Sequence, residues 1–198
     1  MYSTTTLEKL KNTLKQGQVF RRGDLARFFS NIDRHLATLV KEGKLKKLHQ
    51  GLYICPDMTP FGEAPPDEDV LLRSFLKDDR FVVYSPNLFN SLGLGASQLY
   101  NRRLVFNRKR FGEHRVGGRT YFFHRWREAP KKLFPEFLVV EFLNRLEDLA
   151  EDREQLLSRL REKLPQFNPK KLRYAADHYG TYSTQLKLQR LMEAKAHG

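Results

Sequence analysis

The chain has 198 residues, of which 40% are hydrophobic and 30% are charged. This length allows one large domain or two small ones, and this composition excludes a collagen-like or a wholly disordered chain. The 36 Lys and Arg residues outnumber the 23 Asp and Glu residues, so the formal net charge is +13. A surface this basic repels itself unless it binds a polyanion, which makes nucleic acid the first partner to consider.

Cysteine content and hydropathy bear on the cellular compartment. The single cysteine, Cys55, cannot form an internal disulfide and excludes a zinc site built from cysteines. No stretch approaches the roughly 18 apolar residues of a membrane span, and residues 1–14 lack the basic and apolar segments of a secretory signal. We therefore expect a cytoplasmic protein with no membrane partner.

The charges are unevenly distributed along the chain. Residues 1–56 hold 11 basic and 4 acidic residues, and residues 70–130 hold 12 and 4. Residues 57–69, between them, contain five acids, no base and three prolines. This composition predicts an acidic, proline-rich linker that joins a domain at residues 1–56 to a second domain at residues 70–198.

Two short helices are predicted before residue 30. Thr5 and Glu8 fit a capping box, which predicts the start of a helix that ends near Gly17. After a brief extended link, the pattern indicates a second helix from Gly23 to Phe29. Its inward-facing side chains are expected to be Leu25, Phe28 and Phe29.

A third helix is predicted from a cap at Ser30 to a glycine stop at Gly43. Its apolar residues recur at helical spacing and are expected to be buried: Ile32, Leu36, Leu39 and Val40. The opposite side then carries hydrogen-bonding and cationic side chains, of the kinds that contact base edges and phosphates: Asn31, Arg34, His35, Thr38 and Lys41.

The pattern of residues 45–48 and 52–54 predicts two short strands around a turn at residues 49–51. Three helices followed by a hairpin is the order of a winged helix-turn-helix domain, whose third helix enters the major groove. We expect base contacts from Asn31, Arg34, His35 and Thr38. We expect phosphate contacts from Ser30, Lys41, Lys44, Lys46, Lys47, His49 and Gln50. The same element order also occurs in protein-interaction modules, and a charged helix face can be merely solvated.

Four segments carry a resemblance to a known family: Val19-Phe20, the helix at residues 23–29, the Leu-rich helix end at residues 36–45, and Gly51-Leu52-Tyr53. With them, residues 18–56 resemble the N-terminal domain of AbiEi-type antitoxins, the transcriptional regulators of type IV toxin–antitoxin systems. Residues 85–94 are similar to a helix end in the domain that follows, although Phe89 and Asn90 replace smaller residues. The resemblance implies a repressor of its own operon and a cognate nucleotidyltransferase-like toxin as a functional partner.

The remainder of the chain is predicted to mix strands and helices, so the expected fold class is α+β. Strands are expected at residues 81–84 and 104–106. Two more are expected within residues 115–123, where a Gly-Gly turn joins them. Helices are expected at residues 70–76, 136–149, 153–164 and 182–196, with one more capped by Asn168 and Pro169.

A second basic cluster lies in the middle of the chain, interleaved with Tyr100, Phe106 and Phe111. We expect it to add nonspecific DNA affinity through Arg102, Arg103, Arg108, Lys109 and Arg110. The alternative is a groove for RNA. Phe106, Tyr121 and Phe123 are expected in the core rather than against bases.

No catalytic motif is apparent. The chain has no phosphate-binding glycine loop, no Gly-x-Ser-x-Gly elbow and no zinc helix, so we expect no enzyme activity, cofactor or metal. The leading hypothesis is a sequence-specific regulator that binds double-stranded DNA. The alternatives are an RNA-binding module that uses the middle cluster, and a metal-dependent nuclease or nucleotidyltransferase.

Overall fold

The computed structural model describes residues 5–94, 102–149 and 152–193. They form two units, which we describe separately. Unit 1 takes the residues up to 79 together with residues 114–120, and unit 2 takes residues 80–113 and those from 121 onward. This grouping differs from the division at residues 57–69 that the sequence suggests, because the segment that follows the acidic stretch belongs to unit 1.

Unit 1 begins with helix α1 (Thr6–Thr13), which starts as the sequence predicts. The backbone N–H of Glu8 donates to the Thr5 hydroxyl over 3.3 Å, and the Glu8 carboxylate accepts from the Thr5 N–H over 3.0 Å. This capping box satisfies two backbone donors that the first turn leaves free. Leu10 is fully buried and anchors the helix in the core of unit 1.

Helix α2 (Arg22–Leu25) is a single turn, shorter than the predicted helix from Gly23 to Phe29. Leu25 is buried as expected, but the Phe28 side chain is 80% exposed. The prediction for Phe28 was wrong because the chain leaves the helix after Ala26. The backbone then turns Phe29, and not Phe28, towards the core.

Helix α3 (Ile32–Lys41) follows a residue in the left-handed conformation, Asn31, whose φ is 51°. Asn31 and not Ser30 therefore occupies the N-cap position, since asparagine tolerates this conformation better than most residues. Ile32, Leu36 and Leu39 are buried as predicted. Val40 is 38% exposed, so the apolar stripe is narrower than expected.

The end of α3 is set by Gly43, as the sequence predicts. Its φ of +70° lets the chain reverse, and the N–H groups of Gly43 and Lys44 donate to the carbonyls of Val40 and Leu39 over 3.1 and 2.9 Å. These two bonds form a Schellman motif, which satisfies carbonyls at the helix end. The reversal directs the chain from α3 straight into the next strand.

Three strands complete this part of unit 1: β1 (Val19–Arg21), β2 (Lys46–His49) and β3 (Leu52–Ile54). They form an antiparallel sheet in the order β1-β3-β2. The predicted hairpin is thus present, and the extended link before α2 becomes its third strand. The sheet and the three helices enclose a core that includes Leu10, Phe20, Leu36 and Leu45.

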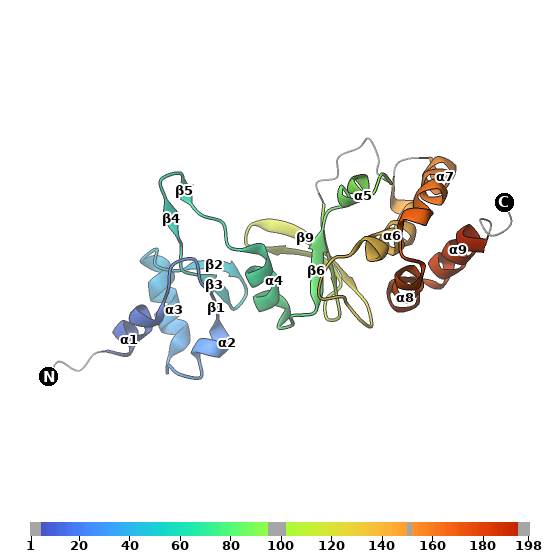
Figure 1. Cartoon of the computed structure of the whole chain (residues 1–198). Coiled ribbons are helices and arrows are strands. Elements are labelled where there is room, and N and C mark those ends of the chain that lie inside the picture. Colours follow the sequence, from blue (N-terminus) through green and yellow to red (C-terminus); the bar gives the residue numbers. More distant parts are fainter. Residues whose placement is uncertain (1–4, 95–101, 150–151, 194–198) are drawn as a thin grey trace. The chain divides into compact units, whose positions relative to one another are not determined.

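The acidic segment is a structured part of unit 1. It forms a small hairpin from β4 (Met58–Thr59) and β5 (Gly62–Glu63), shown in Figure 1. Helix α4 (Glu68–Leu76) follows, and the Asp67 carboxylate accepts from the Val70 N–H over 2.9 Å. Several of the acids are therefore placed at a helix start, where a negative charge is favourable.

Unit 2 is built on a four-stranded sheet of β6 (Phe81–Tyr84), β7 (Arg103–Asn107), β8 (Gly112–Val116) and β9 (Arg119–Arg125). The strand order is β6-β7-β9-β8, with β6 antiparallel and β9 parallel to β7. The β8–β9 hairpin contributes its tip, residues 114–120, to unit 1. The three predicted strand regions are all confirmed.

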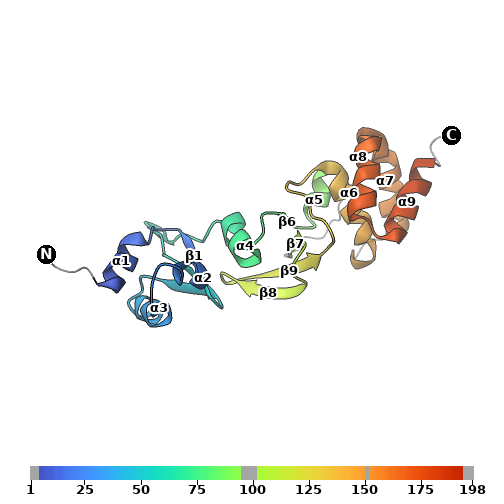
Figure 2. The same ribbon diagram turned by 90° about the horizontal axis from the view of Figure 1, so that it is seen from below.

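Helices cover the sheet of unit 2. They are α5 (Leu88–Ser91), α6 (Pro135–Asn144), α7 (Arg153–Lys163), α8 (Pro169–Tyr179) and α9 (Tyr182–Glu193), with 3-10 turns at Leu146–Asp148 and Leu164–Gln166. Figures 1 and 2 show α6 to α9 gathered on one side of the sheet. Their apolar faces share one core with Val82, Tyr84, Leu104 and Phe106. The α+β class is therefore confirmed; residues 194–196 of the predicted last helix lie outside the described residues.

A buried polar network joins three elements of unit 2. The fully buried Glu141 of α6 accepts a hydrogen bond from the Tyr84 hydroxyl of β6 and one from Arg145 over 3.2 Å. Asn144 donates to Glu141 over 2.7 Å and to the Tyr179 carbonyl over 2.9 Å. Burial is the main reason why the pKa of Tyr84 lies well above its usual value, so this phenol stays protonated as a donor.

No described helix is both long and apolar enough to cross a membrane.

The hairpin tip in unit 1 offers a test of packing. Gly117 and Gly118 have φ values of +59° and +83°, as a two-residue turn requires. A Cβ atom at Gly117 would lie 2.8 Å from a methyl group of the buried Leu71, whereas a Cβ at Gly118 would meet open space.

We expect Gly118→Ala to cost about 1–2 kcal/mol for the left-handed backbone alone. Gly117→Ala should cost about 1–3 kcal/mol more, because Leu71 must shift. Denaturant unfolding followed by circular dichroism measures both variants. Equal losses for the two would show that Gly117 does not approach Leu71 in solution.

Candidate nucleic-acid interface

The outer face of α3 carries the residues that the sequence assigns to base contacts. Asn31 and Arg34 are exposed, and His35 and Thr38 are half-buried. The Thr38 hydroxyl donates to the Arg34 carbonyl over 3.0 Å, so it is turned back onto its own helix. Lys41 is exposed one turn further on. Positions 34, 38 and 41 lie on one side of a helix, which therefore presents a continuous polar face.

A bidentate ion pair fixes the start of α3. The Nε and a terminal nitrogen of Arg22, at the start of α2, donate to the two oxygens of Asp33 over 2.7 and 2.6 Å. The Arg22 guanidinium holds the pKa of the Asp33 carboxyl below its usual value, mainly through this hydrogen bond. The pair joins residues 11 apart in the chain, and sequence periodicity gave no signal for it.

The lysines of the hairpin have different surroundings. Lys47 is exposed, as is Gln50 at the turn. Lys46 donates to both oxygens of Glu63 over 2.9 and 3.0 Å, which links β2 to the β4–β5 hairpin. Lys44 lies 3.4 Å from Glu42, whose carboxylate also pairs with Lys11 at 2.9 Å. Glu42 therefore has a lowered pKa, chiefly because of its hydrogen bond with Lys11.

His49 packs against helix α4 of unit 1. Its ring lies edge-on to the Phe75 ring of α4 at a centroid distance of 4.9 Å, and the carbonyl of the preceding residue, Leu48, accepts from the Gly117 N–H over 3.1 Å. The His49 side chain is half-buried.

Ser30 is exposed beside Asn31. Six of the expected phosphate contacts are thus exposed. Lys44 and Lys46 are paired with glutamates, whereas the side chains of Ser30, Lys41, Lys47 and Gln50 form no hydrogen bond or ion pair within the part of the chain that the structure describes.

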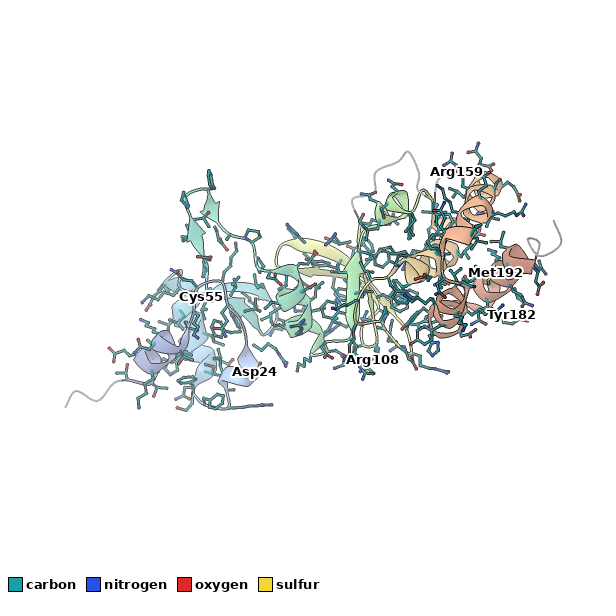
Figure 3. The ribbon with its side chains drawn as sticks, viewed as in Figure 1. Asp24, Cys55, Arg108, Arg159, Tyr182 and Met192 are labelled. Carbon is teal, nitrogen blue, oxygen red and sulfur yellow. The ribbon has the colours of Figure 1, made fainter. Side chains whose placement is uncertain are left out.

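The second basic cluster lies in unit 2. Arg102 is placed over the ring of Phe122, 5.5 Å from its centroid, and Arg103 is half-buried. Arg108, Lys109 and Arg110 are exposed in the turn that follows β7, where Figure 3 labels Arg108. Phe106, Tyr121 and Phe123 are buried, as predicted. Phe111 is exposed, and Tyr100 lies outside the described residues.

Asn107, a residue that sequence analysis did not single out, organises this basic turn. Its buried side-chain oxygen accepts from the N–H groups of Lys109 and Arg110 over 2.8 and 2.7 Å. Its amide nitrogen donates to the carbonyls of Val105 and Arg110 and to that of His124 in β9. The turn therefore has a fixed shape and is tied to the neighbouring strand.

Residues 5–94, 102–149 and 152–193 contain no group of three or more His, Cys, Asp or Glu side chains arranged as metal ligands. The arrangement of α3 and the hairpin instead offers hydrogen-bond donors and positive charge on one unit. Such groups bind phosphates and base edges.

No family model matches the chain, and no curated protein matches it. The fold is similar to that of the RV2827C protein from Mycobacterium tuberculosis, a crystal structure that is 17% identical in sequence with a TM-score of 0.55. The similarity covers 94% of this chain and 74% of that one, and at this identity it concerns the fold alone.

Proposed function

We propose that residues 1–56 are a winged helix-turn-helix domain and that the protein is a transcriptional regulator that binds double-stranded DNA sequence-specifically. The observation that carries the proposal is the outer face of α3, where Asn31, Arg34 and Lys41 are exposed opposite the buried Ile32, Leu36 and Leu39. The element order α1-β1-α2-α3-β2-β3, with β1 paired to β3, supports it.

In this proposal α3 enters the major groove. Arg34 is suited to the two acceptors of a guanine and Asn31 to the donor and acceptor of an adenine. Lys41, Lys47 and Gln50 are exposed and bind the flanking phosphates. To bind phosphate, Lys44 must give up its ion pair with Glu42, and Lys46 must give up its ion pair with Glu63. This loss reduces their net contribution to the affinity for DNA.

The sequence resemblance to AbiEi-type antitoxins supports a more specific assignment. We propose that the target is the operator of the protein's own operon, and that the functional partner is a nucleotidyltransferase-like toxin. The turn at residues 108–110, with Arg102 and Arg103, adds nonspecific affinity for the DNA backbone. Because the proposed target is DNA, we assign the protein to the cytoplasm.

Salt dependence tests the phosphate contacts. A duplex is selected from a random library with the full chain, and its affinity is measured by fluorescence anisotropy over a range of salt concentrations. Removing one lysine–phosphate interaction should lower the slope of log affinity against log salt by about 0.9. Lys41→Ala combined with Lys47→Ala should therefore flatten the slope by about twice that amount.

The matched control is Lys9→Ala, because Lys9 is an exposed lysine on α1 of the same unit. It should leave the slope unchanged. The same titration with single-stranded RNA examines the rival function. Tighter binding of RNA than of the duplex, unaffected by the double substitution, would favour an RNA-binding module in unit 2.

A further inference from the structure

Unit 2 contains a cavity of about 730 Å³ beside the basic turn. This volume is within the range of small-molecule sites. Its walls come from the turn after β7, the end of β9 and helix α8. The lining residues are Arg108, Arg125, Trp126, Arg127, Glu128, Asp177 and His178.

Hydrogen bonds hold the walls of the cavity in place. The backbone N–H of Trp126 donates to the Asn107 carbonyl over 2.7 Å, which ties the end of β9 to the turn that carries Arg108. The Trp126 indole N–H donates to the His178 carbonyl over 2.8 Å, which ties the same segment to α8. The backbone of these walls is therefore held in place before a ligand binds, so that binding has to order only the charged side chains.

Side chains of both charges line the cavity, and four of them form no ion pair within the described residues. Arg125 and Arg127 are exposed, and neither forms an ion pair with another described residue. Glu128 and Asp177 are exposed and likewise form no ion pair within the described chain. Guanidinium groups bind phosphate oxygens through paired hydrogen bonds, and carboxylates accept from hydroxyl and amino groups.

Aromatic rings accompany these charges. The half-buried Trp126 is stacked on His124 with their ring centroids 5.6 Å apart and an angle of 20° between the rings. The ring of His178 is stacked on Tyr174 at 4.0 Å. Stacked pairs of this kind hold planar rings at fixed angles. Any of the nucleobases can pack against such rings, because each base has a flat face.

We propose that this cavity binds a nucleoside phosphate, with Arg125 and Arg127 on the phosphate. Glu128 and Asp177 accept from sugar hydroxyls or base amino groups, and Trp126 contacts the base. The ligand is either a free nucleotide or the phosphorylated end of a strand, since both present the same chemistry. The proposal concerns unit 2 alone and does not depend on DNA binding by α3.

Trp126 is the only tryptophan of the chain, so its fluorescence reports on this cavity directly. The full chain is titrated with ADP, with adenosine, with inorganic phosphate and with a 5′-phosphorylated dinucleotide. We expect a saturable change with ADP, with the dinucleotide, or with both, and much weaker responses to adenosine and to inorganic phosphate. A response to the dinucleotide alone would identify a strand end as the ligand.

The variant Arg125→Ala/Arg127→Ala should weaken this binding by at least about tenfold, the loss expected for charge-assisted hydrogen bonds. Arg161→Ala is the matched control, because Arg161 is an exposed arginine of unit 2 on α7. Circular dichroism confirms that each variant is folded. Three results would each overturn the proposal: no saturable change with any phosphate ester, equal affinity for inorganic phosphate and ADP, or unchanged affinity in the double variant.

Discussion

Replacing Glu141 with alanine is expected to lower the free energy of unfolding by about 3–5 kcal/mol, the cost of leaving a buried charge without its partner. Glu141 is fully buried and accepts from Tyr84, Asn144 and Arg145. Its removal leaves the Tyr84 hydroxyl and the mostly buried Arg145 guanidinium without their main acceptor. Denaturant unfolding, with loss of helix signal as the probe, measures the effect.

The control for this prediction is Glu162→Ala, because Glu162 is an exposed glutamate of unit 2. It should change stability by less than about 0.5 kcal/mol. Adding Arg145→Met to Glu141→Ala should recover part of the loss, since the uncompensated charge is then gone. A loss below about 1 kcal/mol for Glu141→Ala would mean that the network is open to water.

The second prediction concerns sequence preference. Arg34→Ala should reduce the discrimination between a selected duplex and a scrambled one by about 1–3 kcal/mol, which is the worth of one good bidentate base contact. This corresponds to about a 5- to 150-fold loss in the affinity ratio. Anisotropy titrations of both duplexes with both proteins measure it.

Arg161→Ala serves as the control, because it removes the same charge from an exposed position in the other unit. It should leave the affinity ratio unchanged. If Arg34→Ala weakened both duplexes equally, Arg34 would be a phosphate contact and not a base contact. If it changed neither, the placement of α3 in the major groove would be wrong.

The sequence predicted the elements whose signals are local. The capping box at Thr5 and Glu8, the stop at Gly43 and the Gly-Gly turn at residues 117–118 are all present. Each depends on hydrogen bonds or dihedral angles within a few residues, so a short window of sequence contains the necessary information.

Features that depend on distant residues were missed. The packing of the His49 ring follows from Phe75, 26 residues further on. The pair between Arg22 and Asp33, and the hydrogen bond from Asn107 to the His124 carbonyl, likewise join residues 11 and 17 positions apart. No pattern of apolar spacing records such contacts, which is why the candidate site was predicted by residue type and not by arrangement.

Photo-crosslinking tests most directly where DNA lies on the protein. A photoreactive amino acid is placed at Ala37, which is exposed on α3 and is none of the proposed contact residues. The same label at Lys9 of α1 and at Arg161 of α7 provides the comparison. We predict that the selected duplex is captured from position 37 and not from positions 9 or 161. Capture from position 161 with none from position 37 would contradict the proposal that α3 is the DNA-reading helix.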